Sequence, residues 1–226
     1  MKIKKIGHCC LVIEVGGKRI MTDPGGWTSG QVEERGVDII LITHEHGDHL
    51  HTESLKKVLE NNPSCKLVTN SAVKNILVKE NIWTDGEEKE KKFFVLEGGE
   101  VGEELQKVLG INLFAKTCDH ADIYDGIVPV QNTGYLLADR MFYPGDAYLE
   151  IDRPVEILAL PVAGPWAKIR EVIEYAKRVK PKVAFPVHDG LIKEKSITPF
   201  RFLPNKFLGE VGIEFKDLND GETVEF

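Results

Sequence analysis

The sequence predicts an α/β protein, a four-layer αβ/βα sandwich in which two mixed sheets pack face to face with helices outside. Two runs, Val37–Ile42 and Val155–Leu160, are apolar at nearly every position, as is typical of strands buried on both faces. A similar segment precedes each run, at 18–25 and at 139–146, and a loop and a helical pattern follow each. Two such halves would stack their sheets at the centre, although such echoes also arise by chance.

Length and composition describe a folded protein with an acidic balance. The 226 residues suit one domain, 1–226, with a sizeable hydrophobic core. The chain has 29 Lys and Arg against 36 Asp and Glu, which gives a net charge of −7 with histidine neutral. This charge offers no general attraction to nucleic acid or to an anionic membrane, so we expect neither partner.

Cysteine spacing and the N-terminal segment indicate a cytoplasmic protein. The four cysteines show no C-x-x-C spacing, so we expect reduced and mostly buried thiols. The basic start of the chain is followed by an apolar run that Gly7, His8 and Glu14 interrupt, which makes a poor signal peptide. No window approaches the length of a transmembrane span.

Strands and helices should alternate in the first half of the chain. Short strands are predicted over Lys2–Ile6, Cys10–Val15, Arg19–Thr22, Val37–Ile42 and Lys66–Thr69. Gly16-Gly17 indicates a hairpin between the second and third of these strands. Helical spacing predicts one helix over Thr52–Asn61, which Pro63 ends, and another to about Glu80 that Ser71 caps.

The second half should begin with a charged loop over 84–92 and an antiparallel meander. Its predicted strands are Phe93–Leu96, Val101–Leu105, Val108–Lys116, a hairpin of Asn132–Ala138 with Arg140–Tyr143, Val155–Leu160 and Val183–Val187. The spacing of apolar residues predicts an amphipathic helix over Ala167–Val179, which Pro181 ends. After Pro199 we expect one helical turn near Phe207 and then short strands.

A histidine cluster directly after the first buried run carries the main functional signal. It reads His44-Glu45-His46-Gly47-Asp48-His49, an H-x-H-x-D-H pattern. Two histidines that lie two positions apart in extended chain point to one side and can share a metal ion. Gly47 permits a turn that would aim Asp48 and His49 at a neighbouring site. A polar helix N-terminus would explain Asp48 but not the alternating imidazoles, which suit a divalent transition metal.

The remaining ligands are expected at other strand ends, because ligands from several elements form a rigid site. Three residues fit this position. His120 follows the predicted strand 108–116, Asp146 lies in the turn after the hairpin, and His188 follows the strand 183–187. Each one alone would be an ordinary loop residue, but together with the histidine cluster they predict a larger metal site.

These motifs resemble the metallo-β-lactamase superfamily. The resemblance consists of the H-x-H-x-D-H run followed by His120, Asp146 and His188 in this order, and it spans nearly the whole chain. The segments 7–14 and 21–24 are similar to the branch of predicted metal-dependent hydrolases related to L-ascorbate-phosphate lactonases and N-acyl-phosphatidylethanolamine phospholipase. The motif is specific to the superfamily and not to a substrate.

The resemblance implies two divalent metal ions, with zinc expected and manganese or iron as alternatives. One ion would be held by His44, His46 and His120, and the other by Asp48, His49 and His188, while Asp146 would bridge both. A hydroxide bound by both ions would attack a carbonyl or phosphoryl centre. The catalytic residues would be Asp146 and Asp48, and Asp48 would also orient the nucleophile and pass a proton to the leaving group.

Four further residues are candidates for the surroundings of the metals. Asp23 resembles the acidic residue that orients a ligand imidazole in this family, or else it makes a strand-end turn. His8 would contact a ligand or the substrate, or else be a buried hydrogen-bonded histidine. Trp166 and Lys168 follow the second buried run and are candidates for a pocket wall and an anion contact. The alternative for Trp166 is core packing at a helix N-terminus.

Several other residues are assigned lesser roles. Arg201 and Trp27 are weaker candidates for the pocket. His51 is expected at the surface at the start of a helix. Cys118 and the pair Cys9-Cys10 are expected to pack as small buried residues.

The leading functional hypothesis is a metal-dependent hydrolase that cleaves a small ester, lactone or phosphodiester. The alternatives are a di-iron or manganese redox protein and a non-catalytic metal-binding member on the same scaffold. No flavin or electron-carrier domain is visible, which disfavours the redox class, and a complete ligand set disfavours the non-catalytic class. The expected partner is a small molecule, for which an anionic group is suitable because bound metals reverse the local charge. The sequence does not determine the oligomeric state, and a homo-oligomer is one alternative.

Overall fold

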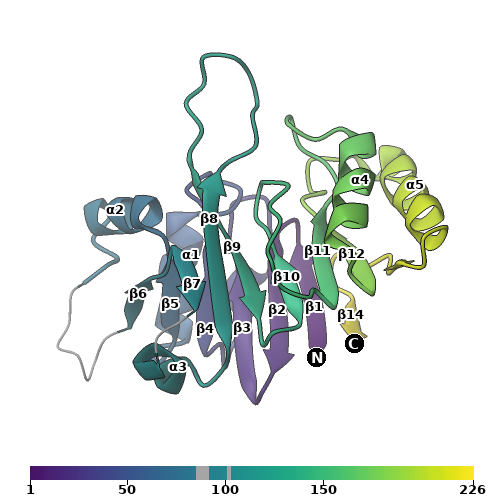
Figure 1. Cartoon of the computed structure of the whole chain (residues 1–226). Coiled ribbons are helices and arrows are strands. Elements are labelled where there is room, and N and C mark those ends of the chain that lie inside the picture. The colour runs from purple at the N-terminus through teal and green to yellow at the C-terminus, as the bar shows by residue number, and fades with distance from the viewer. Residues whose placement is uncertain (85–91, 101–102) are drawn as a thin grey trace.

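Two mixed sheets pack face to face in the computed structural model, and helices cover their outer sides (Figure 1). The structure describes residues 1–84, 92–100 and 103–226. Each sheet has seven strands within these residues. The predicted four-layer sandwich is therefore confirmed.

The first sheet has the strand order β14-β1-β2-β3-β4-β5-β6. Its strands are β1 (Lys2–Gly7), β2 (Cys10–Val15), β3 (Lys18–Thr22), β4 (Ile39–Leu41), β5 (Lys66–Thr69), β6 (Phe93–Val95) and β14 (Thr223–Glu225). The second sheet has the order β13-β12-β11-β10-β9-β8-β7. Its strands are β7 (Gly98–Glu100), β8 (Leu113–Asp119), β9 (Gln131–Leu137), β10 (Met141–Tyr143), β11 (Ile157–Pro161), β12 (Val183–Val187) and β13 (Glu214–Phe215).

Both sheets have the same sequence of antiparallel and parallel pairs. In the first sheet, β14, β1, β2 and β3 pair antiparallel, and β3, β4, β5 and β6 pair parallel. In the second sheet, β7 to β10 pair antiparallel and β10 to β13 pair parallel. A chance echo would not reproduce the whole order, so the internal repeat read from the sequence is confirmed.

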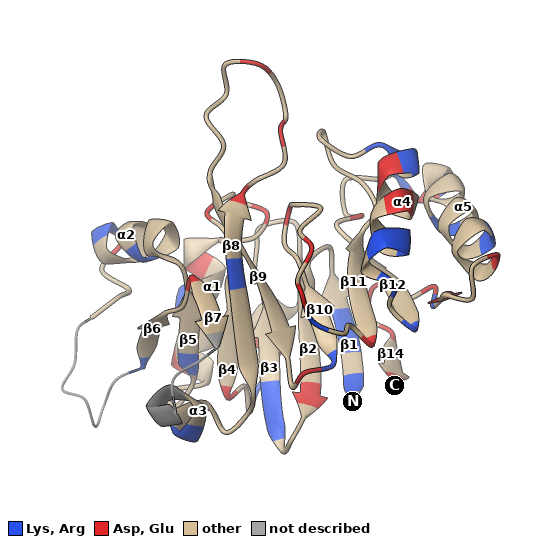
Figure 2. Cartoon of the chain, viewed as in Figure 1, with Lys and Arg blue, Asp and Glu red and all other residues tan. Residues whose placement is uncertain are grey.

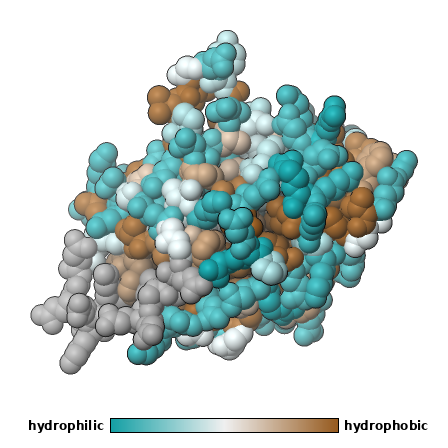
Figure 3. All heavy atoms as spheres, in the orientation of Figure 1, coloured by the Kyte–Doolittle hydropathy of each residue, from teal (hydrophilic) through white to brown (hydrophobic). Residues whose placement is uncertain are grey.

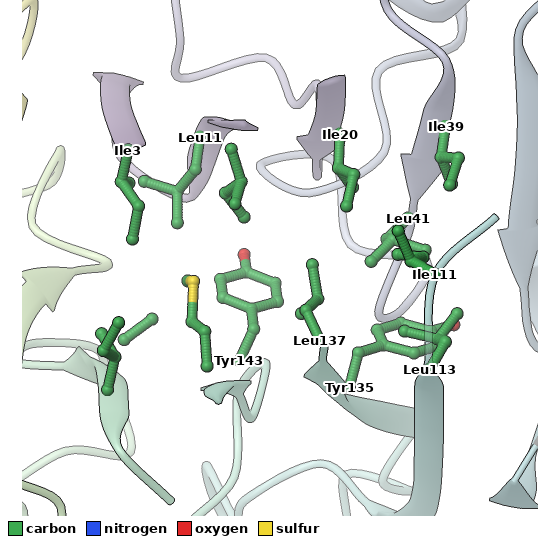
Figure 4. Close-up of a cluster of buried hydrophobic side chains, with 14 of the residues drawn as sticks. Ile3, Leu11, Ile20, Ile39, Leu41, Ile111, Leu113, Tyr135, Leu137 and Tyr143 are labelled. Carbon is green, nitrogen blue, oxygen red and sulfur yellow. The ribbon is translucent and has the colours of Figure 1, made fainter. Parts of the chain in front are cut away.

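The main core lies between the two sheets. Successive side chains of a strand point to opposite faces, so Leu11 and Ile13 of β2 face the second sheet, while Cys10 and Val12 face the helices. Figure 4 shows side chains of β1 to β4 meeting Leu137 and Tyr143 of the second sheet. This buried layer fixes the spacing of the strand ends that carry the polar cluster described below.

Helices cover the outer face of each sheet. The first sheet packs against α1 (Thr52–Asn61) and α2 (Ser71–Lys79), and the second against α4 (Ile169–Val179) and α5 (Thr198–Gly209). The bounds of α1 agree with the prediction. The N-cap of α2 is Asn70 rather than Ser71, because the Asn70 side chain accepts the Val73 N–H at 3.0 Å.

The segment between the two sheets differs from the predicted meander. Residues 103–109, expected to belong to two strands, form helix α3 (Glu103–Leu109), and β8 begins only at Leu113. The strand β7 was not predicted. Part of the predicted strand Val101–Leu105 and most of the charged loop 84–92 lie outside the described residues. Residues 198–209 form the three-turn helix α5, where only one turn was expected.

A long loop between β8 and β9, residues 120–130, stands out beyond the sheets at the top of Figure 1. It carries Asp122 and Asp125, and Figure 2 shows acidic positions on this loop. Apolar side chains are exposed on the same loop, including Val128, which is 84% exposed. Figure 3 shows hydrophobic surface at the top of the molecule. Within the described residues, no helix has the length and apolar character needed to cross a membrane.

Candidate metal centre

All seven predicted ligands gather at one edge of the sandwich, where several strands end. The histidine cluster follows β4, His120 follows β8, Asp146 follows β10, and His188 follows β12. The strands β8, β10 and β12 run in the same direction, because two antiparallel pairs separate β8 from β10 and parallel pairs join β10 to β12. Their carboxyl ends therefore meet at the same edge.

Three imidazoles form one group at this edge. The ring centroids of His44 and His46 lie 4.8 Å apart, those of His46 and His120 lie 4.6 Å apart, and those of His44 and His120 lie 5.2 Å apart. One ring nitrogen of each residue lies within 4.8 Å of the others. Three imidazole nitrogens at this spacing could hold one metal ion.

Asp146 lies between this group and the other histidines. Its Oδ2 is 3.3 Å from His120 Nε2 and 2.7 Å from His188 Nε2, and its Oδ1 is 3.1 Å from His49 Nε2. The carboxylate is 2% exposed. Asp146 therefore has the position that a bridging ligand would need.

Asp48 closes a second group with His49 and His188. Its Oδ2 lies 3.6 Å from His188 Nε2 and 3.9 Å from His49 Nε2. The Asp48 side chain is 14% exposed, while both histidine side chains are almost completely buried. Asp48 is thus the more accessible carboxylate of the cluster.

Among the described residues, several buried polar atoms of the cluster lack a hydrogen bond of good geometry, despite these short contacts. They are Nε2 of His44, His49 and His188, together with Oδ1 of Asp146. Buried polar atoms nearly always have a partner, so atoms that converge without one indicate a group that completes them. Imidazole nitrogens and carboxylate oxygens are the donor set of divalent transition metals, and the residues present therefore fit metal ions.

Burial sets the charge state of the first group. Burial, followed by the nearby charge of His49, lowers the pKa of His44 well below 6.5. Burial and then the charge of His120 also lower the pKa of His46. Burial would raise the pKa of Asp146, but the charges of His49 and His188 hold it well below its usual range. Neutral imidazoles and an ionised carboxylate are the forms that bind metals.

Asp23, at the end of β3, lies beneath His49. Its Oδ2 accepts from His49 Nδ1 at 2.7 Å, from the Thr43 hydroxyl at 2.8 Å and from the Tyr143 hydroxyl at 2.6 Å. Its Oδ1 accepts the Thr43 N–H at 2.8 Å. The bond to Nδ1 turns His49 Nε2 toward the cluster, which is how a carboxylate orients a ligand imidazole. Thr43 and Tyr143 were not singled out from the sequence.

His8 is fully buried and joins Asp48 to the turn after His188. Its Nδ1 accepts the Gly190 N–H at 3.0 Å, so Nε2 carries the ring's proton. Nε2 lies 3.3 Å from Asp48 Oδ2 and donates to it. His8 thus contacts a candidate ligand and orients its carboxylate. The ring of Trp27, which is 54% exposed, lies 5.0 Å from His8.

Trp166 and Lys168 differ in their positions. The Trp166 Nε1–H donates to Asp146 Oδ2 at 3.2 Å, and the ring packs near His120 and His188. The buried ring therefore also reaches the cluster. The Lys168 side chain is 81% exposed and pairs with Glu171 on α4, so the structure does not bring it to the cluster.

One of the minor assignments was wrong. Arg201 is buried against Asp189 and is not a pocket residue. Cys9 is buried in the core as predicted, and its sulfur also lies within 4.8 Å of ring nitrogens of His8, His49 and His188. His51 is exposed at the start of α1, and Cys118 is half-buried and accepts from Asn132 at 3.6 Å.

The turn that carries Asp48 depends on Gly25 rather than on Gly47. A Cβ on Gly25 would overlap the carbonyl of Asp48, while a Cβ on Gly47 would meet nothing within 4 Å. Gly47 also has no positive φ. The Gly26 N–H donates to the Gly47 carbonyl at 2.8 Å, so the loop after β3 packs against this turn and holds it in place.

The chain is similar to known proteins over nearly its whole length. A family model described as a beta-lactamase superfamily domain matches residues 2–188. Protein Rv0786c of Mycobacterium tuberculosis is 31% identical over 223 residues, which cover 91% of this chain and 98% of that protein. A UPF0173 metal-dependent hydrolase of Aeropyrum pernix is 26% identical over 244 residues, which cover 100% of this chain and 97% of that protein.

The fold is also found among solved structures. Igni18, described as a novel metallo hydrolase from the archaeon Ignicoccus hospitalis, superposes with a TM-score of 0.70 at 19% identity. The match covers 100% of this chain and 98% of that chain. At this identity the likeness concerns the fold, namely the two packed sheets with outer helices.

Proposed function

The chain belongs to the beta-lactamase superfamily and is a metal-dependent hydrolase, and from this premise we propose that it uses two divalent metal ions to hydrolyse a small ester, lactone or phosphodiester. The observation that carries the proposal is the Asp146 carboxylate, which lies between two groups of histidines. A carboxylate between two cations offsets their repulsion.

We assign His44, His46 and His120 to the first ion, and Asp48, His49 and His188 to the second, with Asp146 shared. The spacing of the three imidazoles supports the first set. The contacts of Asp146 with His49 and His188 support the second. Zinc is the expected metal, because imidazole and carboxylate ligands suit it, and manganese or iron would fit the same donors.

The chain's own residues have defined roles in this mechanism. When bound, the ions would lower the pKa of a water to about 7 and would stabilise charge on the substrate oxygen. Asp146 holds the two groups together, and the Trp166 N–H fixes its Oδ2. His8 donates to Asp48 Oδ2 and so fixes the orientation of this carboxylate. Asp48, the more accessible acid, is placed to pass a proton to the leaving group.

The metal assignment is tested with the double variant His44→Ala/His46→Ala. We expect it to lose the first ion and to lose most hydrolytic activity, because two of the three imidazoles of that group are gone. The matched control is His51→Ala, which removes an exposed histidine just beyond the same turn. Metal content by mass spectrometry and hydrolysis of esters, lactones and phosphodiesters are measured on each. A double variant with unchanged metal content and activity would refute the assignment.

The substrate class follows from the charges of the proposed site. Two divalent ions bring four positive charges, which Asp48 and Asp146 offset only in part, so an anionic small molecule suits the site. The four cysteines are unpaired, which supports a cytoplasmic location. Iron in the purified protein, with a visible absorption band and no hydrolysis of the substrate panel, would instead indicate the redox alternative.

A further inference from the structure

His188 lacks the hydrogen bond that holds the other buried histidines of the cluster. His44 Nδ1 lies 3.0 Å from the Thr43 hydroxyl, His49 Nδ1 lies 2.7 Å from Asp23, and His120 Nδ1 lies 2.6 Å from the Ala121 carbonyl. His188 Nδ1 has no hydrogen-bond partner among the described residues, while its Nε2 faces Asp146 Oδ2 at 2.7 Å. A ligand histidine is usually oriented through its second nitrogen, so His188 needs another support.

The backbone of His188 is held in an uncommon conformation. Its φ is 60°, which is the left-handed region that residues with a Cβ rarely adopt. Such a conformation persists only where the surrounding structure holds it in place. The His188 N–H donates to the His8 carbonyl at 3.2 Å, which fixes only one side of the turn.

The next residue, Asp189, supplies the second support. Its carboxylate accepts from Lys5 Nζ at 2.7 Å and 2.6 Å, and the Arg201 guanidinium also donates to it. We call Lys5, Asp189 and Arg201 the Asp189 cluster. Their exposed fractions are 0%, 4% and 7%, so the contacts are shielded from water. Lys5 comes from β1 and Arg201 from α5, and both also approach the Leu218 carbonyl.

The same turn supports the ligand on the other side of the proposed second ion. Gly190 donates its N–H to His8 Nδ1, and His8 donates from Nε2 to Asp48. A Cβ on Gly190 would lie 3.0 Å from both Cβ and Nδ1 of His8, so this approach is tight. The position of residues 188–190 thus affects both His188 and Asp48.

We propose that the Asp189 cluster positions His188 and, through His8, Asp48 for the second metal ion. This inference rests on the proposed function, since it concerns one of the two assigned ions. Lys5, Asp189 and Arg201 are positioning residues, because none of them is an assigned metal ligand. They hold His188 through its backbone, whereas the other buried histidines are held by a hydrogen bond to Nδ1.

Arg201→Met is the test variant. It leaves Asp189 paired with Lys5, so no buried carboxylate loses its last cation, and it removes the Arg201 Nε, a buried donor without a hydrogen-bond partner. Lys5→Met is the second variant, which leaves Asp189 paired with Arg201. Arg201→Lys is the conservative variant, and it should keep most of the affinity for the second ion. The matched control is Arg140→Met, which breaks the partly exposed 2.6 Å pair with Glu156; Arg140 directly precedes β10, whereas Asp146 follows it.

The experiment measures how tightly the metal-free protein binds cobalt(II) alone. Equilibrium dialysis gives the number of bound ions and their affinities, and the visible spectrum reports their binding. We expect Arg201→Met and Lys5→Met to lower the affinity for the second ion by about 10- to 100-fold. The affinity for the first ion should not change. The same change introduced into the His44→Ala/His46→Ala background reports the second ion alone. Arg140→Met should bind both ions as the unmodified chain does.

Two results would overturn the inference. One is wild-type affinity for both ions in both variants, and the other is an equal loss at both ions together with a lower melting temperature, which would indicate a structural role only. Failure of the proposed function is distinguishable, because the unmodified chain would then bind fewer than two cobalt ions.

Discussion

The histidines of the cluster differ in the protons they carry before metal binds. Burial lowers the pKa of His44 well below 6.5. Burial also opposes a proton on His49 and on His188, but the charge of Asp146 outweighs it and raises the pKa of both, that of His49 well above 6.5. A metal ion must displace these protons, because only a deprotonated nitrogen is a ligand.

This difference predicts that the two ions respond unequally to pH. The second ion should release more protons at neutral pH than the first, so its affinity should rise more steeply with pH and should be lost first on acidification. Calorimetric titration in buffers of different ionisation enthalpy measures the protons released by each ion. Equal proton release by both ions would contradict the prediction.

Trp166 tests whether a single N–H matters for Asp146. Trp166→Phe keeps an aromatic ring beside His120 and His188 and removes the donor to Asp146 Oδ2. A hydrogen bond to a charged group contributes about 1.5–3 kcal/mol, so metal affinity or kcat/KM should fall by roughly tenfold or more. Trp83→Phe, in the helix-side core next to Phe93, is the control. If Trp166→Phe matched the unmodified chain, packing alone would explain the residue.

The sequence predicted the residues that meet at the cluster but not all of their neighbours. The H-x-H-x-D-H spacing and the strand-end positions of His120, Asp146 and His188 are local patterns, so they can be read directly. Tyr143 contacts Asp23 across 120 positions, and Lys5 contacts Asp189 across 184. Such pairs depend on how the two sheets pack, which no local pattern reports.

At the scale of elements, the loop after β3 determines the position of the turn at Asp48. Gly25→Ala should lower the free energy of unfolding by about 1–3 kcal/mol or more, since a Cβ there overlaps the Asp48 carbonyl and overpacking carries such a cost. Gly47→Ala is the matched control and should be nearly neutral, because that Cβ meets open space. Chemical denaturation measures both. A neutral Gly25→Ala would show that the loop adapts.

Elements with a strong periodic signal were predicted well, and those in the segment between the repeats were not. The strand Lys66–Thr69 and the helix Thr52–Asn61 agree with the structure, because apolar spacing and turn residues coincide there. Helix α3 was expected to be strand, since a seven-residue segment is too short for helical spacing to stand out. Helix α5 has Pro204 in its interior, where a proline removes a backbone hydrogen bond and disfavours a continuous helix.

For the whole molecule, we propose that residues 1–226 form one domain. The core between the sheets draws side chains from both repeats, from Ile3 in β1 to Val187 in β12. We therefore expect a single unfolding transition in calorimetry, with equal calorimetric and van't Hoff enthalpies. Bound metal should raise its midpoint, since the proposed ligands come from both halves. Two separate transitions would contradict the proposal.

The position of strand β14 affects the order in which the first sheet can form during synthesis. It belongs to the first sheet, where residues 223–225 cover the outer edge of β1, and Met1 and Phe226 exchange two backbone hydrogen bonds (Figure 1). During synthesis, β1 must therefore wait for residues 223–225, which are made much later. Until then β1 presents an unpaired edge, and uncovered edges invite pairing with other chains. The growing chain thus passes through a period in which it is exposed to aggregation.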